Sequence, residues 1–394
     1  MIPAHVPKDR VVDLDLFNDP GLKTDLHRKL SSLHSDHPDL FYTPRNEGHW
    51  VVTNLSLASL VLGDYEHFSS SEGSIPRPSK PLPMIPLTLD PPASLPYRTA
   101  LMRYFGPRSI KERESEIRAL AVTLIDGVAG RGGCEFLRSV GAALPVTVFM
   151  NMMGLPLARF DEFRDLVVEY FAPISDQRRL ELYEVIRLEI SSVVADRRRE
   201  PGDDLVSGLA RETIEGRPFS TEDLESICML LFVAGMDTVA NAVTFMFYYL
   251  AKDPVLQRSL IDDPRLIPGF IEESLRMYGV VNIPRLVTRD VELDGVRLLP
   301  GDMILCMLSV AGRDEEVAAD ANHFNASRPE HPHVGFGYGP HVCAGQHLAR
   351  LEMKVLLEEW IKRIPAFSVP SGFVPEFRSW IVLALNRLPL HWST

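Results

Sequence analysis

The spacing of hydrophobic positions predicts a mainly helical protein with a small amount of strand. Short runs rich in β-branched and aromatic residues indicate the strands. Apolar residues that recur every three or four positions indicate helices. The predicted helices cover residues 109–129, 160–171, 178–200, 221–251, 254–261, 266–277 and 345–363, and the predicted strands 49–53, 285–288, 303–305 and 380–383. The pattern therefore indicates a mainly α fold with a minor β part.

The chain shows no internal division. It has 394 residues, which suits one large domain or two ordinary ones. No Ser/Gly-rich or charged linker separates its halves, and no repeat stands out. The proline-rich stretch 75–83 is the most irregular segment, and we expect a loop on the body of the protein there. The prediction is a single domain over residues 1–394.

Composition narrows the choice of compartment and partner. The first ten residues hold no apolar core of signal-peptide length, and the apolar stretch 227–233 is too short to span a membrane. A net charge of −12 argues against general nucleic-acid binding. Cys134, Cys228 and Cys306 show no metal-site spacing and fit core positions. We expect a cytoplasmic, monomeric protein that binds neither membrane nor nucleic acid.

The longest predicted helix, 221–251, carries polar residues in its apolar middle. Ser220 is placed to cap its start. Further on, Asp237 and Thr238 follow Ala234 and Gly235. A threonine hydroxyl can bond back to the carbonyl four residues earlier and bend the helix, and Gly235 would leave room for a small groove beside it. The alternative is a solvated kink without function.

A second informative segment is 336–345, a glycine-rich loop that presents one cysteine, Cys343. Gly337, Gly339 and Gly345 can adopt backbone angles closed to other residues and let a flat ligand approach. A helical pattern follows, and a helix N-terminus favours a thiolate. A thiolate can serve as the axial ligand of haem iron. The alternative is a buried structural cysteine beside a turn.

The order of residues in 336–345 resembles the cysteine-ligand signature of cytochrome P450 monooxygenases. The run Ala234–Thr238 is similar to the oxygen-activation motif of the same family, and further segments resemble its bacterial camphor-hydroxylase branch nearly end to end. The resemblance implies a triangular, single-domain fold that binds haem b through Cys343. It also implies that electrons pass from NAD(P)H through a flavin reductase and a [2Fe–2S] ferredoxin.

The resemblance also implies roles for individual residues. Thr238 would act in oxygen activation, and Asp237 would pass protons inward. Glu273, Arg276 and Arg328 would brace the cysteine loop, although Glu273 and Arg276 alone also fit a solvated helical face. The residues implied in haem binding, besides Cys343, are Arg98, Arg285 and His341 for the propionates, and Phe336, Gly337, Gly345, Ala234 and Gly235 around the ring.

The substrate pocket is expected to be apolar. The camphor branch holds a ketone with a tyrosine in the loop that corresponds to residues 81–88, and this chain has no tyrosine there. A hydroxyl from Thr88 or an amide from Asn282 could add one hydrogen bond. The expected wall is Leu82, Met84, Leu87, Leu230, Val233, Val281, Ile381 and Val382. These residues suit a small apolar terpenoid or norisoprenoid, ionone-like or camphor-like, oriented mainly by packing.

The leading hypothesis is a monooxygenase that hydroxylates an unactivated C–H bond with O₂ and two electrons. A peroxide-driven haem-thiolate enzyme is a second possibility, against which the acid–alcohol pair argues because peroxide bypasses proton delivery. A third is a non-catalytic haem-binding ligand sensor. For the acidic ferredoxin, the basic residues after Arg98 offer a patch, with a solvated helix face as the alternative: Arg103, Arg108, Lys111 and Arg113.

Overall fold

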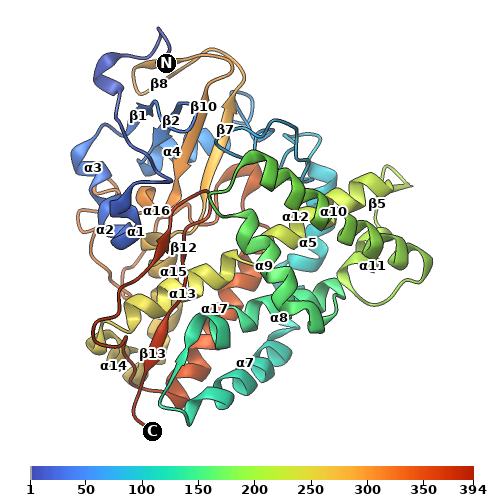
Figure 1. Cartoon of the computed structure of the whole chain (residues 1–394), viewed down its shortest axis with the longest axis vertical. Coiled ribbons are helices and arrows are strands. Elements are labelled where there is room, and N and C mark those ends of the chain that lie inside the picture. Colours follow the sequence, from blue (N-terminus) through green and yellow to red (C-terminus); the bar gives the residue numbers. More distant parts are fainter. Residues whose placement is uncertain (1) are drawn as a thin grey trace.

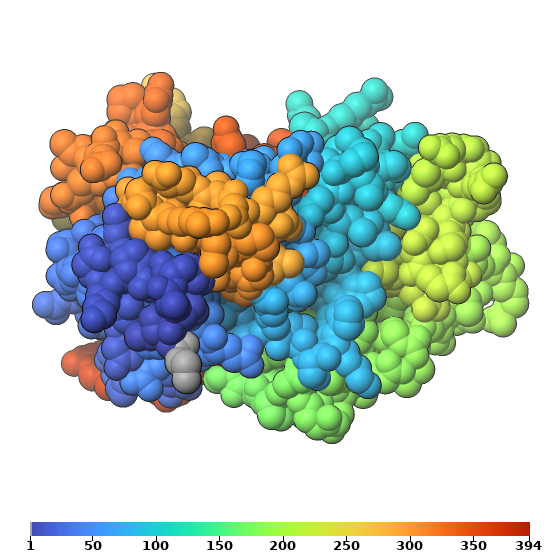
Figure 2. All heavy atoms as spheres, turned by 90° about the horizontal axis from the view of Figure 1, so that it is seen from above, coloured from blue at the N-terminus to red at the C-terminus, as the bar shows by residue number. Residues whose placement is uncertain are grey.

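The computed structural model describes residues 2–394 and confirms a mainly α fold with a minor β part. Figure 1 shows β1, β2, β7 and β10 together near the N-terminus, whereas β5, β12 and β13 lie among the helices of the rest of the molecule. Figure 2 shows the N-terminal segment against the segment around residue 290. Arg10 donates to Asp294 there, over 2.6 Å.

The helices vary widely in length, and the two longest are α10, with 24 residues, and α17, with 18. The α-helices are α1 Pro20–Thr24, α2 Leu26–Ser31, α3 Leu33–Asp36, α4 Leu55–Gly63, α5 Leu95–Phe105, α6 Pro107–Lys111, α7 Glu114–Ala129, α8 Ala143–Met153, α9 Phe160–Tyr170, α10 Asp176–Arg199, α11 Leu205–Ala210, α12 Thr221–Gly235, α13 Thr238–Leu250, α14 Pro254–Asp262, α15 Ile267–Met277, α16 Leu308–Ala311 and α17 Gln346–Arg363. Shorter 3₁₀ or π turns are η1 Lys8–Arg10, η2 Leu137–Gly141, η3 Leu157–Arg159, η4 Pro264–Leu266 and η5 Gly339–His341.

One five-stranded sheet and several two-stranded ribbons make up the β part. The large sheet has the order β1-β2-β10-β7-β3, in which only the β2–β10 pair is parallel. The strands are β1 Leu40–Thr43, β2 His49–Val52, β3 Phe68–Ser69, β4 Gly133–Glu135, β5 Thr213–Ile214, β6 Arg217–Pro218, β7 Asn282–Val287, β8 Val291–Leu293, β9 Val296–Leu298, β10 Met303–Met307, β11 Phe377–Arg378, β12 Ala384–Leu385 and β13 Pro389–His391.

The hydrophobic pattern located the longer helices but missed several shorter helices and strands, overlooked two helix breaks and predicted one strand that is absent. The predicted helix 109–129 is divided into α6 and α7, and the helix 221–251 into α12 and α13. The strand predicted at 380–383 is wrong. Within it Val382 forms one isolated bridge to Val281, and the nearest strand, β12, begins at Ala384. Two backbone hydrogen bonds flank that bridge, from Asn282 N to Ile381 O and from Leu383 N to Val280 O, so the pairing is too short to count as a strand.

The α12–α13 segment passes through the core. Ser220 caps α12 as predicted, since its side chain accepts a hydrogen bond from Asp223 N at 2.9 Å. Residues Thr221–Leu250 have the length and composition of a membrane-spanning helix, but 67% of their most apolar window is buried in the protein. A core helix has the same properties. The segment therefore carries any polar residue at its centre into the middle of the molecule.

Candidate active site

The loop that presents Cys343 is closed by a backbone hydrogen bond. Cys343 N donates to Phe336 O at 2.8 Å, and α17 begins three residues after the cysteine. Gly337 and Gly339 have φ of +75° and +68°, as the glycine pattern predicted. Gly345 differs, because its φ of −81° is open to any residue. A Cβ placed at Gly345 would meet only Cys343 Sγ, at 3.8 Å.

Opposing effects act on the Cys343 thiol. Burial raises its pKa, while the Gly345 N–H and the charges of Arg98 and Arg350 act to lower it. Cys343 nevertheless has a large accessible surface, unlike Cys228 and Cys306 in the core. The Gly345 N–H and the two guanidinium groups thus favour a thiolate, against the larger effect of burial.

Three of the predicted haem-binding side chains gather around this loop. Arg98, on α5, donates to Val342 O at 2.7 Å. Arg285 is 3% exposed and donates to Pro284 O at 2.9 Å. Burial lowers the pKa of both guanidinium groups. Burial, with the charges of Arg285 and Arg98, lowers the pKa of His341 to about 4.

The polar contacts of this basic cluster are incomplete. His341 Nε2 lies 3.0 Å from Ser70 Oγ, and Ser70 donates in turn to Asp90. Among residues 2–394 no carboxylate lies within ion-pair distance of Arg98 or Arg285, and His341 Nδ1 is buried without a partner. Ser94, which stands where the related family often has histidine, also has a buried hydroxyl without a partner.

These observations test whether the residues fit haem. A buried cation, Arg285, and a half-buried one, Arg98, are unfavourable without carboxylate partners unless an anion joins them. Haem carries two propionate groups of the required charge, and its iron accepts a thiolate ligand. The basic cluster and Cys343 lie on the same loop and its neighbours, so their chemistry and their proximity both fit.

The helix break between α12 and α13 has the predicted local bond. Thr238 Oγ1 donates to Ala234 O at 2.9 Å, and the helix resumes at Thr238. The predicted room beside Gly235 is absent, because a Cβ there would lie 2.5 Å from the Phe149 ring. Ala234 is instead the exposed position between the buried Val233 and Met236. Open space at the break therefore lies beside Ala234, not Gly235.

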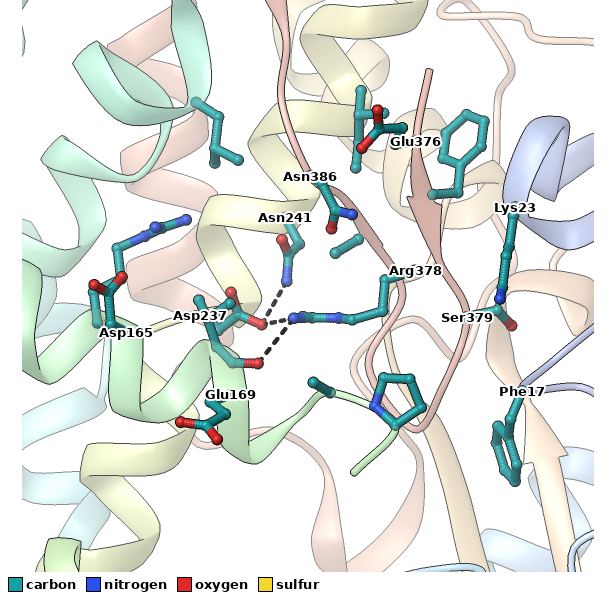
Figure 3. Close-up of a pocket in the computed structure, with 18 residues that line it drawn as sticks. Phe17, Lys23, Asp165, Glu169, Asp237, Asn241, Glu376, Arg378, Ser379 and Asn386 are labelled. Atoms are coloured by element: carbon teal, nitrogen blue, oxygen red, sulfur yellow. Dashed lines mark hydrogen bonds and ion pairs between the residues drawn. The ribbon is translucent and has the colours of Figure 1, made fainter. Parts of the chain in front are cut away.

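Asp237 is not solvated. It is 2% exposed, and its Oδ2 accepts hydrogen bonds from Arg378 Nη2 at 2.7 Å and Asn241 Nδ2 at 2.8 Å (Figure 3). Arg378 also donates to Val168 O at 3.1 Å. Within residues 2–394 the other oxygen, Asp237 Oδ1, has no protein partner. The burial and ion pairing exclude the solvated kink.

A cavity of about 740 Å³ adjoins this ion pair. Asp237, Asn241 and Arg378 line it together with further charged side chains, among them Asp165 and Glu169 (Figure 3). None of the eight residues predicted to contact substrate, and no residue of the Cys343 loop, belongs to this lining. The cavity is polar enough to hold water, which needs several polar partners.

The predicted apolar wall comes from three segments of the chain. Val281 bridges Val382, and Asn282 N donates to Ile381 O at 2.8 Å, so these residues lie side by side. The 82–87 loop is joined to α12 by a bond from Ile85 N to Ser226 Oγ at 3.0 Å. Met84, Val233 and Val382 are buried, whereas Leu82, Leu87, Leu230, Val281 and Ile381 keep partial exposure.

Two polar candidates near this wall differ in availability. Thr88 Oγ1 accepts a bond from Met84 N at 3.1 Å, which leaves its O–H as a donor. Asn282 Nδ2 donates to Trp380 O at 3.3 Å, while Asn282 Oδ1 is buried without a partner among the described residues. Thr88 therefore offers a donor and Asn282 an acceptor.

The predicted Glu273, Arg276 and Arg328 contacts are present. Glu273 is fully buried, and Arg276 donates to it twice, at 2.7 Å each, with Arg328 Nε at 3.3 Å. Against burial, which acts to raise it, hydrogen bonds from Arg276 and His331 lower the pKa of Glu273 to about 2. This set reaches residues 312–331, so the expectation that it braces the cysteine loop itself is not met by any direct contact.

Sequence reasoning missed several residues of the site. Asn241 lies four positions after Asp237 on one helical face, a spacing that could have indicated the contact. Arg378 lies 141 positions from Asp237 and carried no local signal. Glu272 was overlooked beside Glu273, although it contacts both sides of the cysteine loop.

The mainly helical fold, the sulfur before α17 and the basic cluster define a protein of the haem-thiolate class. Comparison with known proteins makes the assignment specific. Residues 144–386 match the family model described as "Cytochrome P450". The chain belongs to the cytochrome P450 family, whose members are haem-containing monooxygenases.

The similarity to named relatives extends over most or all of the chain. "Probable cytochrome P450 127A1" of Sinorhizobium fredii is 34% identical, over all of this chain and 97% of the relative. "Steroid C26-monooxygenase" of Mycobacterium tuberculosis is 33% identical over 82% of this chain and 92% of the relative. Among solved structures, CYP101J2 has a TM-score of 0.90 at 34% identity and CYP101C1 a TM-score of 0.91 at 31% identity. Each likeness between structures covers both chains fully.

Proposed function

We propose that this P450 monooxygenase hydroxylates an unactivated C–H bond of a small apolar terpenoid or norisoprenoid, with two electrons delivered by a [2Fe–2S] ferredoxin. We further propose that it works as a cytoplasmic monomer. The observation that carries the proposal is the combination of Cys343 with Arg98 and Arg285, neither of which pairs with a carboxylate among residues 2–394. The full-length likeness to CYP101J2 and CYP101C1 supports a place near the camphor-hydroxylase branch.

In this proposal the protein residues hold the cofactor in place. Haem, when bound, supplies oxygen activation and insertion into the C–H bond. Cys343 provides the axial sulfur, and Arg98, Arg285 and His341 bind the propionates. Phe336, Gly337 and Gly345 lie along the sulfur side, and Ala234 lies on the open side of the helix break.

Asp237 and Thr238 then move protons at the break. Asp237 Oδ1 lines the polar cavity and can accept a proton from water there. Since Oδ2 is held by Arg378 and Asn241, the carboxyl has to exchange one of these contacts before it turns inward. The Thr238 hydroxyl is held in place by its bond to Ala234 O. In this proposal it orients the last proton donor on the side of the break that faces away from the cavity.

The proposed substrate is held chiefly by apolar contact. The eight predicted wall residues offer no charge, and five of them keep exposed surface. Thr88 offers an O–H donor near this wall and Asn282 Oδ1 an acceptor, so a ketone or a hydroxyl on the substrate would each have one partner.

The proposed ferredoxin surface is weaker than the sequence predicted. Arg103 lies 2.7 Å from Glu212, and Arg113 lies 3.8 Å from Glu116, so acidic neighbours partly neutralise both. Arg108 lies 3.5 Å from Glu112 but is almost fully exposed, and Lys111 is exposed as well. Arg108 and Lys111 on α6 are therefore the residues we expect a ferredoxin to contact.

A reconstituted assay tests the proposal. Purified protein is titrated with monoterpenoid alcohols, ionones and camphor while the haem band is followed for a shift from low to high spin. Ligands that shift the band are then incubated with NADH, a flavin reductase and a [2Fe–2S] ferredoxin, and products are identified by mass spectrometry. The expected result is one added oxygen atom per product, with NADH consumption coupled to product.

Other outcomes of this assay would reject parts of the proposal. Product formed with hydrogen peroxide but not with the ferredoxin system would identify a peroxide-driven enzyme. Ligand binding without product under either condition would identify a sensor. Spin shifts confined to large steroids or fatty acids would reject the terpenoid assignment while leaving the monooxygenase assignment intact.

A further inference from the structure

Two neighbouring glutamates on α15 bind different parts of the chain. Glu273 contacts Arg276, Asn325 N, Arg328 and His331, all of which precede the cysteine loop. Glu272, the residue before it, instead contacts His333 and Arg350. These two residues flank the segment that carries Cys343, one on each side.

On the near side of the loop, the hydrogen bonds of His333 define which nitrogen carries its proton. Gly335 N donates to His333 Nδ1 at 3.0 Å, so that nitrogen is an acceptor. The other nitrogen, Nε2, is therefore the donor, and it lies 3.1 Å from Glu272 Oε2. The His333 side chain is 7% exposed, so water competes little for this bond.

On the far side, Arg350 holds both oxygens of the same carboxylate. Its Nε donates to Glu272 Oε1 at 2.6 Å and its Nη2 to Oε2 at 3.0 Å. This paired geometry restricts direction as well as distance. Gln346 Oε1, at the start of α17, accepts a third bond from Arg350 Nη1 at 2.9 Å.

Arg350 also connects this carboxylate to the loop itself. Its guanidinium carbon lies 4.5 Å from the centre of the Phe336 ring, a cation–π contact. The carbonyl of Phe336 accepts the backbone N–H of Cys343.

We propose that Glu272 is a positioning residue for the sulfur ligand: one carboxylate ties the segment before the Cys343 loop to the helix after it. The inference rests on the proposed haem ligation by Cys343. Because Glu272 and Arg350 keep 27% and 31% of their side-chain surface, solvent weakens the pair as a source of global stability. Its effect is on the position of Arg350 and Phe336, and through them on the sulfur.

Substitution of Glu272 tests this, with an exposed pair as the control. Glu272→Leu removes both partners, and Glu272→Gln keeps the shape but loses the charge. The control is Glu184→Gln, because Glu184 forms a similar two-bond pair with Arg187, at 2.9 and 2.6 Å, on the surface of α10. Two readouts are followed in haem-loaded protein: transfer of haem to apomyoglobin, and conversion of the reduced CO complex from the thiolate-type to the thiol-type spectrum.

We expect Glu272→Leu to speed both processes about tenfold, the effect of losing charge-assisted hydrogen bonds. Glu272→Gln should speed them several-fold, with the thermal midpoint of unfolding close to that of Glu184→Gln. Parent rates in Glu272→Leu would overturn the inference, as would equal acceleration in the control.

A second substitution keeps the test decisive if Glu272→Leu does not fold. Arg350→Lys retains the charge but cannot span both carboxylate oxygens, and it should also accelerate conversion to the thiol-type spectrum. Parent behaviour in both Glu272→Gln and Arg350→Lys would overturn the inference. If the parent protein itself never shows a thiolate-type spectrum, the proposed ligation fails and the inference falls with it.

Discussion

The carboxylates near Cys343 and the carboxylate at the break between α12 and α13 differ in how their partners hold them. Near Cys343, Glu272 and Glu273 each bind two or more side chains, and hydrogen bonds lower the pKa of both to about 2 against the effect of burial. At the break, Asp237 binds Arg378 and Asn241 through a single oxygen. Arg378 Nε is buried without a partner in the described part of the chain.

The difference indicates what each side has to do. A carboxylate held by several directed hydrogen bonds has one favourable arrangement, which suits a residue that positions a ligand. An ion pair beside a polar cavity of about 740 Å³ can exchange a protein partner for water at lower cost. The sulfur side is thus built to stay fixed and the helix break to rearrange.

The largest effect should come from Cys343→Ala. Without the sulfur, the reduced CO complex should lose the thiolate-type band, and hydroxylation should fall by more than about a thousandfold because the thiolate assists O–O cleavage. Cys228→Ala, in the core of α12, is the matched control and should keep both properties. A thiolate-type band in Cys343→Ala would show that another residue supplies the ligand.

Asp237→Asn should have the next largest effect. The amide keeps the size of the side chain but cannot carry a proton as a carboxyl does, so turnover should fall about 100-fold. The solvent isotope effect on turnover in D₂O should rise as proton transfer becomes limiting. Asp165→Asn, which changes an exposed carboxylate of the same cavity, should leave both near parent values. Unchanged turnover in Asp237→Asn would contradict the proposal that the side chains at the helix break rearrange during turnover.

Thr238→Ala should lower the share of electrons that ends in product more than it lowers the rate of NADH consumption. Product formed per NADH should fall several-fold while NADH consumption continues, because the ordered hydroxyl at the break is lost. Thr244→Ala is the control, since Thr244 makes the same back-bond to Ala240 O, at 2.6 Å, further along α13. If product formed per NADH falls equally in the two variants, helix bending rather than the Thr238 hydroxyl explains the result.

Short-range features of the site could be predicted from the sequence because local geometry determines them. The bond from Thr238 to Ala234 O and the cap at Ser220 each span three or four residues. The Glu273–Arg276 pair has the same helical spacing. Each follows from the period of one helix, whatever packs against it.

Tertiary features could not be predicted in this way. The space beside Gly235 is filled by Phe149, which comes from another helix, and Arg378 reaches Asp237 from a short strand near the C-terminus. The segment 380–383 has the composition of a strand but pairs with residues 280–282 through a single bridge and the two hydrogen bonds beside it. In each case the deciding partner is distant in the chain, and hydrophobic spacing carries no record of it.

One carboxyl on the sulfur side departs from the pattern of multiple partners. Glu352 lies on α17, 1% exposed, and its Oε1 has no partner among residues 2–394. Burial raises its pKa from 4.5 to about 8. The carboxyl is therefore protonated in the folded protein at neutral pH but ionised in the unfolded chain, so folding has to bind a proton.

Glu352→Gln should stabilise the protein, and the gain should depend on pH. The raised pKa means that the parent has its full stability below pH 4.5 and loses part of it as the pH rises towards 8, where the gain in free energy of unfolding for the variant should reach on the order of 1–3 kcal/mol. The test is the urea midpoint of each protein across this range, with Glu116→Gln on the exposed face of α7 as control. A gain that does not change with pH would show that Glu352 has a partner that keeps it ionised. Glu352 would then match Glu272 and Glu273, which are also held by partners.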